Sequence, residues 1–373
     1  MFFEKYKPIP KSKIRENQKK FFEKNGINAW KKGHIPFDFT NNSYYTYKLV
    51  QNIIDIINNS QLNTQKNINI LEVGAGSGLF AINFLYRIEQ LDPQIFNKIN
   101  YTITDYSQTI LDNIQKNNHI QYFMKKGVLQ TKPFDISKDT PPLDIDIFLM
   151  NYVVCNIPFQ CIKKQNNIYY EKTILPKSPI LKENYQKIDK PSYSHIIDKF
   201  LDNKTTNETV INTTFLDFLA KVFDTEKEKF VYVADSGSSH HFELLNYGEN
   251  FFNKVNFELI EIWLKQQKIN FTRKQFENPK FSKSIITNSN YTKDFFYDHK
   301  DDFLYKNLKS TYNLIFENKL EKAQKNLEKV IKYRDKDANI YFHYSKILKK
   351  LGKNYSRAWD LCKKYDYLDL YTK

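Results

Sequence analysis

The stretch ILEVGAGSGLF, residues 70–80, constrains the fold of this 373-residue chain more than any other. Residues that favour strands run into three glycines at alternate positions, and the chain then becomes apolar at helical spacing. A strand that passes into a helix through a glycine-rich turn is typical of Rossmann-like α/β folds, in which the turn lies against a ligand. Such turns hold phosphates, dinucleotides or S-adenosylmethionine (SAM), and the spacing of the glycines discriminates among these ligands.

The three glycines are Gly74, Gly76 and Gly78, which gives the pattern GxGxG. A dinucleotide fingerprint requires GxGxxG, and a P-loop requires a lysine directly after its last glycine; the stretch has neither. Because glycine has no Cβ, the backbone of such a turn can approach the amino-acid part and the sulfur of SAM closely. With the acidic Glu72 just before the turn, the pattern indicates SAM as the cofactor.

A second carboxylate is expected at the end of the next strand, where it would accept hydrogen bonds from the ribose hydroxyls. Asp105, in the stretch YTITDYS, stands at that place. The alternative is a strand–helix turn with incidental glycines, in which Asp105 only caps a helix. The combination of turn and acids favours the cofactor, and the predicted SAM-binding residues are Glu72, Gly74, Ala75, Gly76, Ser77, Gly78, Asp105 and Tyr106.

Apolar strands and amphipathic helices alternate around the glycine turn. Continuous apolar strands separated by helices are what a parallel sheet covered on both faces requires. The sequence therefore predicts an α/β fold with a Rossmann-like class I SAM-dependent methyltransferase core, built on a doubly wound, mostly parallel sheet. The expected strands are 68–74, 99–107, 144–154 and 229–235, and the expected helices are 44–59, 79–91, 108–117, 213–223 and 255–270.

The chain divides into three parts of different character. Residues 1–60 are expected to form a helical segment, and residues 61–285 the SAM-dependent methyltransferase domain. Within that domain the strand pattern loosens at about 159–225, which predicts an insertion on the substrate side of the sheet. Residues 296–373 are expected to form an all-helical extension.

The extension contains two similar helix pairs. Residues 310–333 and 340–365 superpose so that Ala323 falls on Ala358, a spacing of 35 residues. Tetratricopeptide repeats have a period of about 34 residues. Because such repeats bury an apolar face on a neighbour, we expect the extension to pack against the core and to offer a docking surface to a protein partner. A plain helical bundle without repeat ancestry is the alternative.

Composition limits the classes of partner. The net charge is +15, but the basic residues are mostly lysines spread evenly along the chain, so nucleic acid is not expected as a partner. Cys155, Cys161 and Cys362 have no metal-binding spacing, so no metal is expected. No apolar run approaches the roughly 20 residues of a membrane span. A cytoplasmic location is expected, or the mitochondrial matrix in a eukaryote, and a homodimer is left open.

The order of several stretches resembles the MidA-like methyltransferases. This family includes the mitochondrial complex I assembly factor that methylates protein arginine, so the resemblance implies SAM and a protein acceptor. It covers about residues 35–275, and its most diagnostic part is the last stretch. The matching stretches are 37–53, 72–88, 101–115, 151–160, 168–174, 231–239 and 246–270.

One segment departs from the family pattern. The family's fourth-strand segment begins Asn-Glu and continues to an Asp, whereas this chain has Asn151, followed by Tyr152 and, at the second acidic position, Asn156. Carboxylates orient a guanidinium best, because they pair with its fork of donors. The departure argues against arginine as the acceptor and does not affect the predicted SAM site.

Candidate catalytic residues follow the expected strands. The SAM sulfonium is reactive by itself, so the enzyme mainly aligns the acceptor and, where needed, removes a proton. Asn151 and Tyr152 end the fourth strand beside the expected methyl group. His240, with His241 next to it, follows the strand 229–235 and could act as a general base, the alternative being a surface loop. Asp235 and Gly237 are expected to shape that turn.

Three functions are compatible with these features. The first is a SAM-dependent methyltransferase that modifies a nitrogen or oxygen of a protein side chain, with the extension binding the partner. The second keeps SAM but has a small-molecule acceptor. The third is an assembly or scaffold protein that retains the fold after its activity has weakened.

Overall fold

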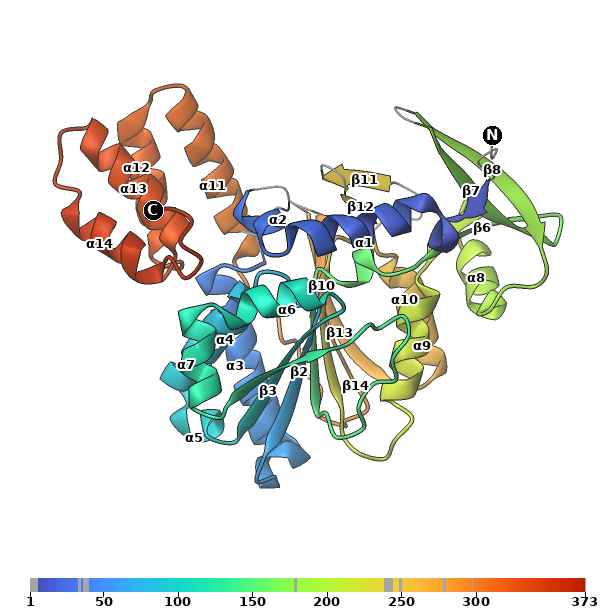
Figure 1. Ribbon diagram of the computed structural model, residues 1–373. Helices are drawn as coiled ribbons and strands as arrows, with labels where there is room; N and C mark the ends of the chain where they lie inside the picture. Colours follow the sequence, from blue (N-terminus) through green and yellow to red (C-terminus); the bar gives the residue numbers. More distant parts are fainter. Residues whose placement is uncertain are drawn as a thin grey trace.

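The structure, a computed structural model, describes residues 6–32, 35, 40–177, 180–237, 244–247, 250–277, 280–296 and 298–372. Its centre is a seven-stranded sheet (Figure 1) in which neighbouring strands are parallel from β10 to β4, while β14 runs antiparallel to both of its neighbours. In sheet order the strands are β13 (Asn270–Glu277), β14 (Lys280–Thr287), β10 (Phe230–Asp235), β5 (Ile147–Asn151), β2 (Ile68–Val73), β3 (Ile99–Asp105) and β4 (Leu129–Pro133).

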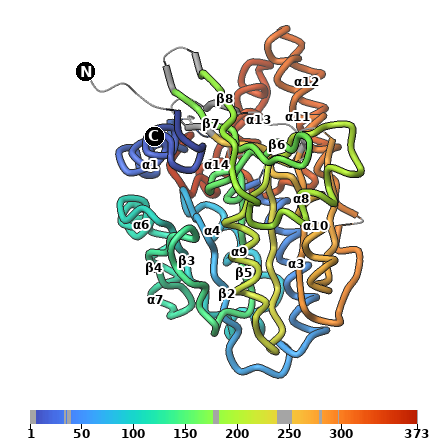
Figure 2. Tube along the Cα trace, turned by 90° about the vertical axis from the view of Figure 1, so that its right-hand side faces the viewer, coloured from blue at the N-terminus to red at the C-terminus, as the bar shows by residue number. Residues whose placement is uncertain are grey.

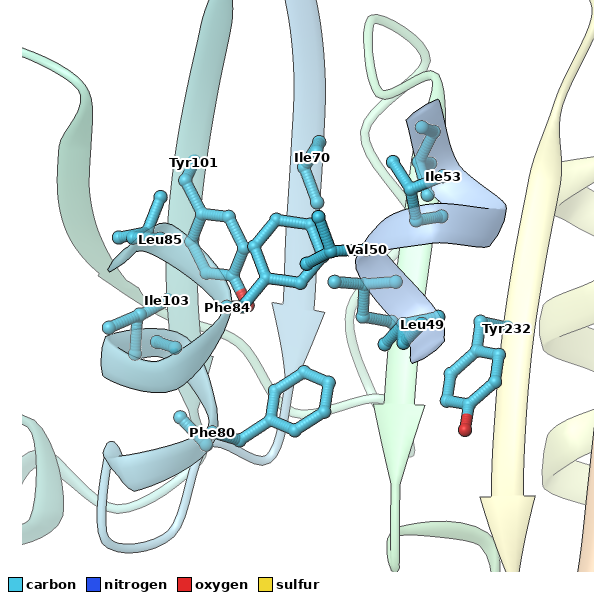
Figure 3. Packing of buried hydrophobic residues seen from close by; sticks show 14 of the residues in the cluster. Leu49, Val50, Ile53, Ile70, Phe80, Phe84, Leu85, Tyr101, Ile103 and Tyr232 are labelled. Carbon is cyan, nitrogen blue, oxygen red and sulfur yellow. The ribbon is translucent and has the colours of Figure 1, made fainter. Parts of the chain in front are cut away.

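Helices cover both faces of this sheet. Side chains of one strand alternate between the faces, so that in β5 Ile147 and Leu149 join one apolar cluster while Phe148 and Met150 join the other. Figure 3 shows part of the first cluster, in which residues of α3 and α4 pack on β2 and β3. The first face carries α3 (Ser43–Asn59), α4 (Leu79–Leu91), α5 (Pro93–Phe96), α6 (Gln108–Gln115) and α7 (Asn118–Lys125); the second carries α8 (Ser194–Leu201), α9 (Thr213–Val222) and α10 (Phe257–Gln266).

These elements confirm the predicted α/β class and the mostly parallel, doubly wound sheet. Every strand and helix expected from the sequence has a counterpart within a few residues of its predicted ends. The agreement has a physical cause: strands buried on both faces must be apolar throughout, and helices that cover them must be apolar on one side, so both leave clear patterns.

The region 159–225 differs from its predicted loose character, because it contains four strands of a second sheet, to which the N-terminal segment adds β1. Its strands are antiparallel, and β6 turns into β7 through Asn166 and Asn167, both of which have positive φ. Such an Asn-Asn pair is typical of a two-residue hairpin and was the missed signal; the many lysines hid the strand pattern. The strands are β1 (Lys7–Pro8), β6 (Gln160–Gln165), β7 (Ile168–Lys177), β8 (Ile180–Ile188) and β9 (Glu208–Ile211).

The remaining segments gather at one end of the central sheet. Figure 2 shows α1, the hairpin of β7 and β8, and the C-terminal helices at this end, which is the end where α1 crosses the sheet in Figure 1. The segments are α1 (Lys13–Asn25), α2 (Asn28–Lys31), the hairpin of β11 (Leu244–Tyr247) and β12 (Asn250–Asn253), and the short helices η1 (Ile9–Lys11) and η3 (Val154–Asn156). The short helix η2 (Gln61–Thr64) instead lies at the opposite end of the sheet, between α3 and the start of β2.

The C-terminal part consists of two helix pairs that pack on the core. Tyr44, at the start of α3, lies in one apolar cluster with Leu304 and Leu308 of the first C-terminal helix. Ala323 and Ala358 are both buried. Within the described residues, no helix is both long and apolar enough to cross a membrane. The helices are α11 (Asp301–Phe316), α12 (Leu320–Ile331), α13 (Ala338–Lys350) and α14 (Ser356–Tyr365).

A buried ion pair joins the core to the first helix of the extension. Lys283 of β14 lies with its Nζ 2.8 Å from Oδ1 of Asp301, and the two side chains are 1% and 3% exposed. Nδ1 of His299 lies 3.3 Å from the same ammonium. A buried charge that loses its partner cannot be solvated, so this contact is sensitive to the removal of either side chain.

We predict that Asp301→Ala lowers the free energy of unfolding by about 3–5 kcal/mol, because it leaves the Lys283 ammonium buried and unpaired. Urea denaturation checks this value. The control is Glu317→Ala, which removes the exposed partner of Lys319 and should cost less than about 1 kcal/mol. Equal losses in the two variants would contradict the role given to the buried pair.

Candidate functional site

The carboxyl ends of β2, β3, β4 and β5 face two adjoining cavities beneath α1, which share several lining residues. They measure about 760 and 680 Å³, counting the parts open to solvent. Both are bordered by Phe22 and Trp30 from the N-terminal helices and by Tyr152 after β5. The predicted site residues that line one or both cavities are Glu72, Gly74, Ala75, Gly76, Ser77, Asp105, Tyr106, Asn151 and Tyr152.

Gly78 is a predicted site residue that does not line these cavities. Gly78, with φ +76°, is the residue from which α4 starts, and Ile114 lies close beneath it. Its conformation is left-handed, which favours glycine. His240, together with His241, lies outside the described residues.

The glycine turn permits a close contact with the N-terminal segment. Gly76 has φ +57°, and a Cβ placed on it would lie 2.7 Å from Cζ2 of Trp30. A Cβ on Gly74, whose φ is +69°, would lie 3.0 Å from Cγ2 of Val153. At both positions the left-handed backbone favours glycine, and a Cβ would prevent the neighbouring side chain from approaching as closely. The indole of Trp30 closes over the turn as a result.

Asp105 ends β3 beside the turn. Its Oδ2 accepts a hydrogen bond of 3.3 Å from the backbone N–H of Gly76, and its Oδ1 accepts one of 3.0 Å from Ser107. Burial raises the pKa of Asp105 to about 6, although these N–H donors act in the opposite direction. The carboxylate thus bonds the backbone of the glycine turn at the edge of the larger cavity.

Glu72 lies below the turn in β2 and is 2% exposed. Its Oε2 accepts a hydrogen bond of 2.9 Å from the hydroxyl of Tyr101. Burial raises the pKa of Glu72 to about 8, and the Tyr101 hydroxyl offsets only part of this effect. The side chain is therefore a carboxylic acid at neutral pH and would become a carboxylate beside a cation.

Tyr106 contributes a polar atom without a partner. Tyr106 lines the larger cavity with Asp105, and its hydroxyl is buried and makes no hydrogen bond with the described atoms. The Nζ of Lys19 in α1 lies 5.5 Å from the centre of its ring. A buried hydroxyl without a partner is uncommon, and this one belongs to a residue that borders the larger cavity.

Asn151 holds a neighbouring segment in place. Its Oδ1 accepts a hydrogen bond of 3.0 Å from Tyr45, whose hydroxyl accepts one of 2.6 Å from Tyr232. Its Nδ2 lies 3.3 Å from the carbonyl oxygen of Thr40 and from Oδ1 of Asn41. The amide therefore anchors residues 40 and 41 at the cavity wall, and one lone pair of its oxygen stays available.

Tyr152 adopts a left-handed conformation with φ +58°, which is rare for a residue with a bulky side chain. Its N–H donates a hydrogen bond of 2.8 Å to the carbonyl oxygen of Ala234 in β10. The ring stands 5.6 Å from that of Phe281 and lines both cavities. Such conformations cost about 1–3 kcal/mol and are concentrated at functional sites.

Asp235 fixes the turn that follows Tyr152. Its Oδ2 accepts a hydrogen bond of 3.0 Å from the N–H of Cys155 in η3, and burial raises its pKa to about 6. A Cβ on Gly237 would lie 2.9 Å from the ring of Phe257. Both residues shape this end of the sheet, whereas most of the turn predicted for them, after β10, lies outside the described residues. Within the described ranges, no group of three or more His, Cys, Asp or Glu side chains is placed to hold a metal ion.

The sequence did not reveal the contribution of α1. Arg15 donates a hydrogen bond to the carbonyl oxygen of Asn156, and the Nζ of Lys19 lies 3.3 Å from Oδ2 of Asp135 after β4. Trp30 also lines both cavities. These contacts join residues more than 40 positions apart, so no local pattern announces them. Asp135 lies two residues after the end of β4, a strand that was not predicted from the sequence.

Comparison with known proteins gives a family and a fold. Residues 51–272 match the profile of a family described as "Putative S-adenosyl-L-methionine-dependent methyltransferase". A crystal structure from Burkholderia thailandensis with bound S-adenosylhomocysteine aligns with a TM-score of 0.54 at 11% identity, over 78% of this chain and 98% of that one. A second structure of the same superfamily and organism aligns with 0.53 at 12% identity over the same shares. No curated protein matches.

The raised pKa of Glu72 makes stability depend on pH. The group has a pKa of about 4.5 when unperturbed and about 8 in the fold, so its favourable contribution is complete below pH 4.5 and is lost as the pH rises through 8. Glu72→Gln keeps an acceptor for Tyr101 and cannot ionise. We predict that it gains stability relative to the unmodified protein between pH 5 and pH 9, measured by urea denaturation.

The matched control for this measurement is Glu321→Gln, an exposed position on α12. It should follow the unmodified protein at every pH. A stability difference for Glu72→Gln that stays constant from pH 5 to pH 9 would show that Glu72 does not titrate in this range.

Proposed function

The chain belongs to the family of S-adenosyl-L-methionine-dependent methyltransferases, and on that premise we propose that the cavities beneath α1 carry methyl transfer from SAM to a nitrogen or oxygen of a protein side chain. The observation that carries this proposal is that the glycine turn, Asp105 and Tyr152 line the same pair of adjoining cavities. We retain the three predicted parts of the chain, 1–60, 61–285 and 296–373, as part of the same proposal.

The residues present fit SAM. Asp105 would accept hydrogen bonds from the ribose hydroxyls, Tyr106 would use its unpaired hydroxyl on the adenosine part, and Glu72 would face the ammonium. The turn from Gly74 to Ser77 leaves room for the amino-acid part because Gly74 and Gly76 have no Cβ. When bound, SAM supplies a methyl group on a positively charged sulfur.

The protein's own contribution is alignment and the exclusion of water. Tyr152, held in its left-handed backbone conformation, would contact the acceptor and orient it toward the methyl group. Asn151 would hold Thr40 and Asn41 in place at the opposite wall. Helix α1 and Trp30 cover the cavities from above. Alignment of this kind accounts for much of the acceleration when the donor is intrinsically reactive. His240 remains the candidate for removing a proton from a hydroxyl acceptor.

A protein acceptor is supported by the resemblance to MidA-like methyltransferases and by the tetratricopeptide-like extension beside the site. Asn41 borders both the cofactor-side cavity and a groove lined by residues of the extension, so a partner bound there would lie next to the cavity. Tyr152 and Asn156 replace the acidic residues of the family pattern. An acceptor other than arginine therefore fits the site better.

A small-molecule acceptor is the second candidate, and the lining of the smaller cavity favours it. Phe22, Trp30, Phe80, Tyr152 and Phe252 surround the space next to the turn. Aromatic rings at this density suit a flat or apolar molecule.

Incubation with methyl-labelled SAM and a lysate tests the function and the acceptor together. We predict label in a macromolecular product, and loss of labelling in Gly76→Ala, because the new Cβ would lie 2.7 Å from Trp30. The matched control is Gly127→Ala: its φ is +74°, but nothing lies within 4 Å of the added Cβ. It should cost about 1–2 kcal/mol of stability and leave labelling unchanged.

The other outcomes of this experiment separate the alternatives. Label confined to a low-molecular-weight product favours the small-molecule acceptor. SAM binding without any labelled product favours a scaffold of weakened activity. Labelling by Gly76→Ala at the unmodified rate would contradict the proposed site.

A further inference from the structure

A third large cavity lies away from the methyl-transfer site, at the junction of the core and the C-terminal extension. It measures about 1010 Å³, counting the part open to solvent. Its walls come from the start of α3, from α4, from the segment before α13 and from α14. We call it the junction cavity and define it by Ser43, Arg87, Gln90, Lys336, Lys364 and Tyr367.

The walls of the junction cavity are held together by specific contacts. The rings of Tyr86 in α4 and Tyr367 after α14 stack with their centres 5.5 Å apart. The side chain of Asn117 donates a hydrogen bond of 2.7 Å to the carbonyl oxygen of Tyr367. Figure 1 shows the C-terminal helices beside the core at this place. The cavity is therefore part of a fixed junction between the two parts of the chain.

Three cationic side chains from three separate elements meet at this cavity. Arg87 belongs to α4, Lys336 to the connection between α12 and α13, and Lys364 to α14. Burial lowers the pKa of Lys336, and the charges of Arg87 and Lys364 lower it further, while the charge of Asp335 acts in the opposite direction. Like charges repel, so this arrangement raises the free energy of the structure unless an anion joins it.

The carboxylates nearby offset only part of this charge. Asp335, which is 57% exposed, forms an ion pair of 3.6 Å with Arg87, and Glu89, which also lines the cavity, pairs with Lys126. Lys336 donates a hydrogen bond to the neutral amide of Gln90. Within the described part of the chain, neither Lys336 nor Lys364 forms an ion pair. The cavity thus keeps an excess of positive charge.

Ser43 supplies a second, independent indication. It is 3% exposed, lines the cavity as the first residue of α3, and its hydroxyl has no hydrogen-bond partner among the described atoms. The first turn of a long helix also presents the positive end of its dipole. A buried hydroxyl without a partner, in a residue that lines the same cavity as Lys336 and Lys364, is a feature of an anion site.

We propose that the junction cavity binds the phosphate group of a small molecule. A phosphate carries up to two negative charges and several acceptor oxygens, so it can engage cations from three directions, which a single carboxylate does less well. Because Arg87 belongs to the core and the two lysines to the extension, such a ligand would tie the two parts of the chain together.

Isothermal titration calorimetry of the full chain with pyrophosphate, at fixed ionic strength, tests this site. We expect saturable one-to-one binding that the double variant Lys336→Gln/Lys364→Gln weakens by about tenfold or more, because two charge-assisted contacts are lost. The matched control is Lys350→Gln, which removes an exposed lysine at the end of α13. It should bind pyrophosphate as tightly as the unmodified chain does, and acetate should not compete.

Two readouts keep this test decisive. SAM binding and circular dichroism of the double variant should be unchanged, which separates the site from the methyl-transfer cavities and from loss of folding. If the double variant does not fold, Ser43→Ala tests the site instead, and we expect it to weaken pyrophosphate binding several-fold. The absence of saturable binding, or an equal loss in Lys350→Gln, would overturn the proposal.

Discussion

The close approach of Trp30 to Gly76 is the contact on which the rest of the site depends. A side chain at residue 76 would collide with the indole, and the backbone there has a φ that favours glycine. Because the position is glycine, the N-terminal segment can close over the carboxyl edge of the sheet. The same absence of a Cβ leaves the backbone accessible from the cavity side. Gly76 therefore allows Trp30 to cover the predicted cofactor site and also leaves the backbone of the turn accessible within it.

The sequence predicted those parts of the structure that local pattern determines. The glycine turn follows β2 and Asp105 ends β3. Because these apolar strands are parallel neighbours, their carboxyl ends bring the turn and the carboxylate together, as expected. Arg15 and Trp30 could not be placed, because their contacts depend on how α1 packs over residues far along the chain. The strands of 160–211 were missed because their lysines and tyrosines obscure the alternation, although Asn166-Asn167 marks a hairpin.

A continuous polar path connects the site to the C-terminal helices. Asn151 is bonded to Tyr45, and the Nζ of Lys283 lies 4.1 Å from the centre of the Tyr45 ring. Lys283 in turn pairs with Asp301, the first residue of α11. Buried polar groups are costly unless satisfied, so these side chains restrict one another's positions. The extension thus contributes to the fixed geometry of the wall that faces the cavity.

The central claim is that the glycine turn and Asp105 hold SAM, and calorimetry with SAM on the intact chain tests it most directly. The account predicts one binding site, with affinity reduced at least about tenfold in Asp105→Ala, because charge-assisted bonds to the ribose are lost. Asp112→Ala, which removes an exposed carboxylate on α6, should bind like the unmodified protein. Absence of SAM binding, or equal affinity in Asp105→Ala, would contradict the account.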